Sequence, residues 1–282
     1  MQNAIKKWFP LFVLPTVVAF IISFIAPFLT GIYLSFNKFR ALDFDKMKWV
    51  GFSNYEKAFA DTAFVDALWF TVRFTVVSVI TINVIAFLLA LLLTKGIKGT
   101  NIFRTIFFMP NLIGGIVLGY IWLMIINGVL SYFDVSITYD ANYGFWGLVI
   151  LMNWQLIGYM MIIYIAGIQN VSPDLLEAAD IDGATNWQKL TKITIPQVMP
   201  SITICTFLTL TNSFKLFDQN LALTAGAPGK QTQMLALDIY NTFYGRSGYF
   251  GVGQAKAVVF FVIVAVIALA QLYFTRSKEV ES

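Results

Sequence analysis

Amide and ionisable side chains inside long apolar runs are the residues of this sequence best suited to chemistry. The amides fall near the middle of three such runs, at Asn83, Asn153, Gln155 and Asn212. Lys215 and Asp218 follow, three and six positions after Asn212. Polar groups in apolar spans are energetically costly and usually face a bundle interior or a water-filled path. These residues are therefore candidates for a path that a polar ligand could follow.

The same set of residues has two interpretations. Aromatic rings occur at similar depths, at Trp154, Tyr159, Phe214 and Phe217. A sugar offers hydroxyls to amides and apolar ring faces to aromatic side chains, so the set would suit a carbohydrate path. In the alternative, the amides bond across helices as packing contacts, and Lys215 pairs with Asp218 at i,i+3 spacing as a structural ion pair. The sequence leaves both interpretations open.

Few residue types needed for catalysis or metal binding are present. The sequence has no histidine and one cysteine, Cys205, which excludes histidine acid–base catalysis, thiol-rich zinc sites and an internal disulfide. It also lacks the GxxxxGK[ST] loop that cradles ATP phosphates. We therefore expect no catalytic residue, no metal ion and no cofactor bound by this chain.

The elements that carry these residues are predicted to be membrane-spanning helices. The chain is 58% hydrophobic and 12% charged, with a mean hydropathy of +0.74, whereas soluble domains are roughly half apolar and a quarter charged. A spanning helix needs about 20 mostly apolar residues. Six runs qualify: 11–34, 67–93, 103–126, 145–168, 198–223 and 255–274. We expect an all-α membrane protein with about six transmembrane helices in a single domain over residues 1–282.

The positions of lysine and arginine predict that both termini lie in the cytoplasm. The segments then placed inside carry most of the basic residues: Lys6, Lys7, Lys95, Lys98, Arg104, Lys189, Lys192, Arg276 and Lys278. The first outside loop, 37–66, breaks the pattern with five basic residues, balanced by five acidic ones. The positive-inside rule is strongest for short loops, such as the one with Lys95 and Lys98. The net charge of +4 thus indicates orientation rather than a nucleic-acid partner.

The segment between the fourth and fifth runs is predicted to form two short helices joined at a glycine. Ser172 suits an N-cap and Pro173 suits the first helical position. Gly183 suits a left-handed helix stop. Thr185 and Gln188 have the spacing of a capping box for the second helix. Local chemistry predicts a compact helical protrusion, although a simple connecting loop would carry the same signals.

This segment carries a family resemblance. Its motifs are Glu177-Ala178-Ala179, Asp182-Gly183-Ala184 and Ile193-Thr194-Ile195-Pro196. They resemble the EAA loop of permeases in binding-protein-dependent ABC importers. Further motifs look like the sugar-transporting, maltose-permease-like branch: Phe107-Phe108-Met109-Pro110, Phe217-Asp218 and Leu223-Thr224-Ala225-Gly226-Ala227-Pro228. Ala227 replaces one of two glycines usual before that last proline.

The resemblance implies a type I ABC importer permease fold in a bacterial or archaeal inner membrane. It implies a second related permease subunit, a cytoplasmic ATPase dimer that uses the ATP, and an extracellular or periplasmic solute-binding protein that delivers a carbohydrate. The chain itself would be no enzyme. The residues implied to dock against the ATPase are Glu177, Ala178, Ala179, Asp182, Gly183 and Ala184. The sugar, the nature of the outer compartment, and a hetero- or homodimeric permease pair stay open.

Two other functions compete with this prediction. A secondary transporter driven by an ion gradient would show inverted repeats and unwound half-helices, and no such repeat is evident in the sequence. A membrane-embedded enzyme would need a cluster of reactive groups. The absence of histidine and of carboxylate clusters in the apolar runs leaves that alternative with few suitable residues.

Overall fold

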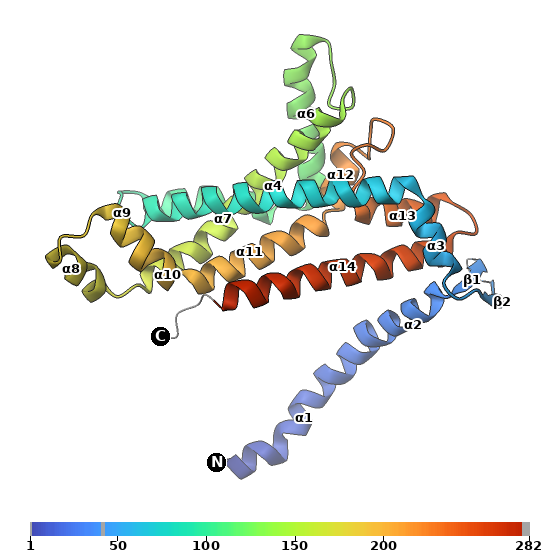
Figure 1. Ribbon diagram of the computed structural model, residues 1–282, viewed down its shortest axis with the longest axis horizontal. Coiled ribbons are helices and arrows are strands. Elements are labelled where there is room, and N and C mark those ends of the chain that lie inside the picture. Colours follow the sequence, from blue (N-terminus) through green and yellow to red (C-terminus); the bar gives the residue numbers. More distant parts are fainter. Residues whose placement is uncertain (1, 41–42, 278–282) are drawn as a thin grey trace. The chain divides into compact units, whose positions relative to one another are not determined.

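The computed structural model describes residues 2–40 and 43–277, most of them helical (Figure 1). The chain divides into two compact units, Met1–Phe64 with Ile239–Phe261, and Val65–Asp238 with Val262–Ser282. Three helices belong partly to each unit: α4 (Thr62–Leu93), α13 (Leu235–Gly245) and α14 (Phe250–Arg276). That the whole chain acts as one permease domain stays a prediction.

The first unit begins with a long helical run and continues into a hairpin. The run comprises α1 (Gln2–Phe20), the π-helix Ile21–Ile25 and α2 (Ala26–Ser35). The antiparallel hairpin pairs β1 (Asn37–Arg40) with β2 (Asp43–Trp49), and α3 (Ser53–Ala60) follows it. Buried Asn54 donates from Nδ2 to the carbonyls of Ser35 at 2.8 Å and Asn37 at 2.9 Å. The described parts of the expected outside loop 37–66 are therefore folded, and Asn54 ties α3 to the end of α2.

A buried charge network also holds the first unit together. Lys256 Nζ, fully buried, donates to Asp61 Oδ2 and to Thr242 Oγ1, each at 2.9 Å. Arg246 Nη1 donates to the same Asp61 oxygen at 2.8 Å. Burial raises the pKa of Asp61, but the hydrogen bonds and charges of Lys256 and Arg246 outweigh it, so this pKa lies below its usual value. The network compensates the cost of burying the Lys256 charge.

The second unit is a helical bundle around α7. In chain order it contains the rest of α4, then α5 (Thr100–Phe108), the 3-10 helix Met109–Leu112, α6 (Gly115–Leu130), the 3-10 helix Ser131–Phe133, α7 (Ala141–Gln169), α8 (Pro173–Ile181), α9 (Asn186–Lys189), the π-helix Leu190–Thr194, α10 (Ile195–Gln197), α11 (Met199–Phe214) and α12 (Asp218–Leu223). The most apolar window of α7 is 61% buried, against 28% for α4. Helix α7 is therefore the centre of this unit.

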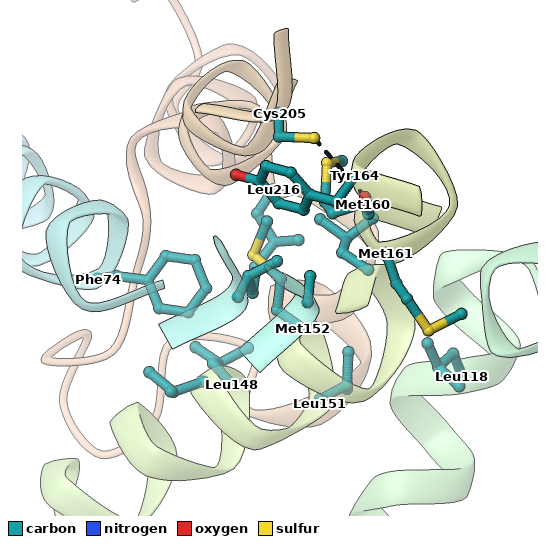
Figure 2. Close-up of a cluster of buried hydrophobic side chains, with 14 of the residues drawn as sticks. Phe74, Leu118, Leu148, Leu151, Met152, Met160, Met161, Tyr164, Cys205 and Leu216 are labelled. Carbon is teal, nitrogen blue, oxygen red and sulfur yellow. Dashed lines mark hydrogen bonds between the residues drawn. The ribbon is translucent and has the colours of Figure 1, made fainter. Parts of the chain in front are cut away.

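The core of the second unit lies along α7 (Figure 2). Leu148 and Met152 of α7 and Phe74 of α4 all belong to this buried cluster. At the other end of the cluster the Cys205 thiol donates to the Met160 carbonyl, with a sulfur-to-oxygen distance of 3.7 Å. Apolar packing of α4 and α11 against α7 therefore buries the one cysteine and leaves it with a structural role.

The helices agree with an all-α membrane protein. Within the described ranges, five helices are long and apolar enough to cross a membrane, and a bent pair of helices supplies a sixth. Four of these contain or nearly coincide with expected runs, namely Leu11–Ser35, Thr62–Leu93, Ala141–Gln169 and Phe250–Arg276.

The expected run 103–126 is interrupted. Helix α5 ends at Phe108 and α6 begins at Gly115. Pro110 lies in the break, and it has no backbone N–H to continue a helix. The membrane-length helix here is instead Gly115–Phe133.

The expected run 198–223 is also not one helix. Helix α11 ends at Phe214 and α12 begins at Asp218. Before this break, the hydroxyls of Thr211 and Ser213 donate to backbone carbonyls four residues earlier, a contact that favours helix bending. At its other end, α11 meets the segment Asn186–Gln197 at an angle of 68°.

Two glycines of α6 allow α12 to pack closely against it. A Cβ atom at Gly119 would lie 2.5 Å from the Cβ of Ala222, and one at Gly115 would lie 2.8 Å from the Cβ of Asp218. Small residues at such a crossing let helix backbones approach. The short helix α12 is thereby fixed on α6, beside the break that follows α11.

Candidate functional site

A polar cavity of about 260 Å³ lies in the second unit. Its lining residues come from α7, from the 3-10 helix before α6, and from both sides of the break between α11 and α12. They are Asn111, Met152, Gln155, Leu156, Tyr159, Asn212, Lys215, Leu216 and Gln219. Non-helical backbone at membrane depth is tolerated where it lines such a cavity. Both helix breaks therefore contribute to the same site.

A close backbone contact brings the first break to α7. A Cβ atom at Gly158 would overlap the backbone carbonyl of Phe107. Since glycine has no Cβ, the end of α5 can lie directly on α7 at this point. Asn111, four residues further on, is thereby placed in the cavity lining beside Gln155 and Tyr159 of α7.

Two amides of the lining are joined by a hydrogen bond. Gln219 of α12 donates from Nε2 to Oε1 of Gln155 at 2.8 Å. Gln155 in turn donates from Nε2 to the Ile113 carbonyl at 3.4 Å. These contacts link α12, α7 and the segment before α6. They fix the orientation of both amides, so this side of the cavity has a defined polar surface.

The remaining polar groups of the lining are available for a ligand. Within residues 2–40 and 43–277, the side chains of Asn111, Asn212 and Lys215 make no hydrogen bond to another part of the chain. Lys215 is also the one charged residue among the lining residues. The cavity can thus offer two amides and one ammonium group to the hydroxyls or anionic groups of a ligand.

The predicted pairing of Lys215 with Asp218 is not formed in the structure. Lys215 lies in the break between helices, and Asp218 is the first residue of α12. No ion pair joins them in the described part of the chain. The i,i+3 prediction assumed a continuous helix, which ends at Phe214. Lys215 instead lines the cavity, whereas Asp218 does not.

Other predicted path residues lie in helix packing. The Tyr164 hydroxyl donates to Asn83 Oδ1 at 2.7 Å, and Asn83 Nδ2 donates to Thr209 Oγ1 at 3.3 Å. Asn153 is 8% exposed and donates to the Val149 carbonyl of its own helix. The lining therefore contains Gln155, Asn212 and Lys215 of the predicted set. It does not contain Asn83, Asn153, Phe214, Phe217 or Asp218.

Two polar lining residues were not named in the sequence analysis. They are Asn111 and Gln219. Asn111 directly follows Pro110, and a helix break at this proline would have been the available signal. Gln219 directly follows Asp218, and nothing local distinguishes the orientation of its side chain. Both became recognisable only after the two helix breaks were located.

The segment after α7 forms the expected two-helix protrusion. Ser172 precedes α8 with extended backbone, although its side chain makes no capping hydrogen bond, and Pro173 is the first helical residue. Gly183 ends the turn with a φ of +77°. Thr185 and Gln188 form the capping box of α9. Local sequence signals therefore predicted this segment closely.

The predicted docking residues lie mostly at the surface of this protrusion. Glu177, Ala178, Asp182 and Gly183 are exposed, Ala184 is half-buried and Ala179 is buried. Two large apolar residues are also open to solvent, Ile181 at 87% and Trp187 at 71% exposed. A surface of this kind, small and apolar with a few charges, suits contact with another protein.

A continuous bent path joins this protrusion to the cavity. From α9 the chain passes through the π-helix Leu190–Thr194 and α10, bends by 68°, and continues as α11. Helix α11 has 16 residues, about 24 Å at 1.5 Å per residue. Its last turn and the break after it supply Asn212, Lys215 and Leu216 to the cavity. A multi-pass helical bundle with such a cavity and protrusion is organised as a membrane permease.

Comparison with known proteins assigns the family. Residues 82–280 match the family model described as "Binding-protein-dependent transport system inner membrane component". The chain belongs to this family, and it is therefore a multi-pass inner membrane component of a binding-protein-dependent transport system. Membership supports the predicted importer permease over the gradient-driven alternative.

Individual relatives match along almost the whole chain. The chain is 44% identical over 282 residues to the probable starch degradation products transport system permease protein AmyD of Thermoanaerobacterium thermosulfurigenes, covering 97% of this chain and 96% of the relative. It is 27% identical to the multiple sugar-binding transport system permease protein MsmF of Streptococcus mutans, covering 98% and 97%.

A solved structure shows the same fold. A chain from a bacterial ABC transporter involved in the import of the acidic polysaccharide alginate matches with a TM-score of 0.81 and 22% identity, covering 98% of both chains. A structure of the alginate transporter with a pentasaccharide-bound periplasmic protein matches with a TM-score of 0.80. The chain therefore has the type I permease fold of ABC importers.

Proposed function

We propose that this permease carries a sugar or oligosaccharide, released by a solute-binding protein, through the cavity at the end of α11. The single observation that carries this proposal is the lining itself, in which fixed and available amides, Tyr159 and Lys215 meet at two helix breaks. Sugar hydroxyls suit the amides, and a sugar ring face suits the tyrosine. The names of the relatives AmyD and MsmF support a carbohydrate cargo.

The volume of the cavity limits how much of a ligand this subunit can contact. Its volume of about 260 Å³ lies just under the range of about 300–1,000 Å³ usual for small-molecule sites. An oligosaccharide would therefore contact this subunit with only part of its length. The rest of the path would come from a second related permease subunit, as expected for the family.

The protrusion is proposed to couple transport to ATP hydrolysis. Its exposed residues from Glu177 to Ala184 would dock into a surface cleft of a cytoplasmic ATPase, present as a dimer. With this docking we expect α8 and both chain termini on the cytoplasmic side. The lack of a phosphate-binding loop supports a chain that is not an enzyme and binds no cofactor, with ATP used by its partner.

The direct test is transport by the complete complex in proteoliposomes. The permease, its sister subunit, the ATPase and the binding protein would be reconstituted, and uptake of labelled maltooligosaccharides compared with uptake of labelled amino acids. We expect uptake of the sugar that needs both ATP and the binding protein, and no hydrolysis by the purified permease alone. Uptake driven by an ion gradient without ATP, or uptake of amino acids only, would contradict the proposal.

A further inference from the structure

The junction between α8 and α9 has almost no hydrophobic core. Helix α9 has no buried residue, and Ala179 is the one buried residue of α8. Backbone hydrogen bonds close the turn itself, from Gly183 to the Asp180 carbonyl and from Ala184 to the Ala179 carbonyl. These bonds fix the turn, whereas α9 has no buried residue to pack against α8. Some other contact must hold the angle between them.

One ion pair spans this junction. Lys189 Nζ lies 2.6 Å from Asp180 Oδ1. Across the fully described segment 172–197, it is the only side-chain hydrogen bond between α8 and α9. The Lys189 side chain is 20% exposed, whereas that of Asp180 is 61% exposed. The aliphatic part of Lys189 therefore packs against the protein, and its ammonium group binds the more exposed Asp180 carboxylate.

The segment from α8 to the π-helix is anchored to the bundle at two separate points. Leu176 of α8 and Ile193 of the π-helix each pack against the core of the second unit. Between these anchors lie the exposed turn and the ion pair. Beyond Ile193 the chain continues through the 68° bend into α11, which ends at the cavity. Along the chain, a displacement of α8 is passed to α11 through α9 and the bend.

We propose that the Asp180–Lys189 ion pair makes α8 and α9 move as one body, so that a displacement of α8 is passed to α11. Asp180 and Lys189 are thus positioning residues, since neither touches the cavity. This inference rests on the proposed docking of α8 against an ATPase. An exposed ion pair stabilises one geometry only modestly, so we expect partial loss of coupling and not loss of folding.

The test is a charge exchange in the complete transporter. Asp180→Lys, Lys189→Asp and the double exchange would be reconstituted, and sugar transported per ATP hydrolysed would be measured. Each single variant should lower this ratio by about two- to fivefold, and the double exchange should restore it. Lys in the last turn of α8 suits the negative helix end, so Asp180→Lys tests pairing and not helix stability.

Control variants separate the possible failures. Lys192→Asp makes the same charge change at an exposed residue that forms no ion pair in the described chain, and it should leave the ratio unchanged. The proposal is overturned if the single variants match the unaltered protein, or if the double exchange is as impaired as the worse single. Failure of the docking role would appear separately, as a Gly183→Asn variant with normal ATPase co-purification and normal transport.

Discussion

The cavity and the α8–α9 protrusion are built in opposite ways. The protrusion is made by residues close in sequence, with capping-box partners three positions apart and ion-pair partners nine positions apart. The cavity is made by side chains far apart, such as Gln155 and Gln219, and it needs two helix breaks in the correct places. The comparison teaches that local signals define the surface offered to a partner, whereas packing defines the ligand site.

The largest effect should come from adding a Cβ where the cavity depends on close backbone packing. Gly158→Ala places a methyl group on the Phe107 carbonyl, so α5 must move away from α7. Overpacking of this kind costs about 1–3 kcal/mol or more. We expect a sharp fall in the yield of monodisperse protein and in its melting temperature. Gly128→Ala is the matched control, because nothing lies within 4 Å of its added Cβ. Equal behaviour of the two variants would disprove the role of this contact.

The next effect distinguishes two amides on the same helix. Gln155 lines the cavity and Asn153, two residues earlier, does not. Gln155→Leu leaves Gln219 Nε2 without its partner in a partly buried site, and a stranded polar group of this kind costs about 1 kcal/mol or more. We expect sugar transport to fall about tenfold, with normal membrane assembly. Asn153→Leu should change stability more than transport. The cavity assignment is wrong if Asn153→Leu impairs transport more strongly than Gln155→Leu.

A smaller effect tests the protrusion. Gly183 has a φ of +77°, and nothing lies within 4 Å of its added Cβ. Asn tolerates this backbone conformation better than Ala, so Gly183→Asn adds volume with little strain and Gly183→Ala adds strain with little volume. If a partner covers the turn, Gly183→Asn should weaken ATPase co-purification severalfold, whereas Gly183→Ala should mainly lower the stability of the loop. Stronger loss with Ala would show that backbone conformation matters more than space.

The smallest expected effect concerns Lys215 and Asp218, whose substitutions should show no energetic coupling. Lys215 and Asp218 form no ion pair in the described chain, so Lys215→Met and Asp218→Asn should act independently. The double variant should then equal the sum of the single variants to within about 0.5 kcal/mol, measured as changes in transport and in unfolding free energy. Rescue of Lys215→Met by Asp218→Asn would show that the two charges pair in some state of the permease.

The sequence by itself determined the class of protein and much of its local structure. Long runs of apolar residues must be removed from water, either in membrane helices or in a buried core. Six such runs in one chain indicate a membrane protein. The protrusion could be predicted from the sequence because its signals are local. Pro173, Gly183, Thr185 and Gln188 affect the backbone only within four residues of themselves. Family motifs in that same segment then indicated a permease.

Only the tertiary structure decided which polar residues line the cavity. Gln155, Asn212 and Lys215 were predicted. Asn83 and Asn153 have the same sequence signal, but Asn83 bonds to neighbouring helices and Asn153 donates within its own helix. Asn111 enters the lining because Pro110 breaks the helix and Gly158 admits the Phe107 backbone. The orientation of a side chain in a bundle depends on the neighbouring helix. That neighbour is fixed by contacts between residues dozens of positions apart, for which the periodicity of a single run contains no information.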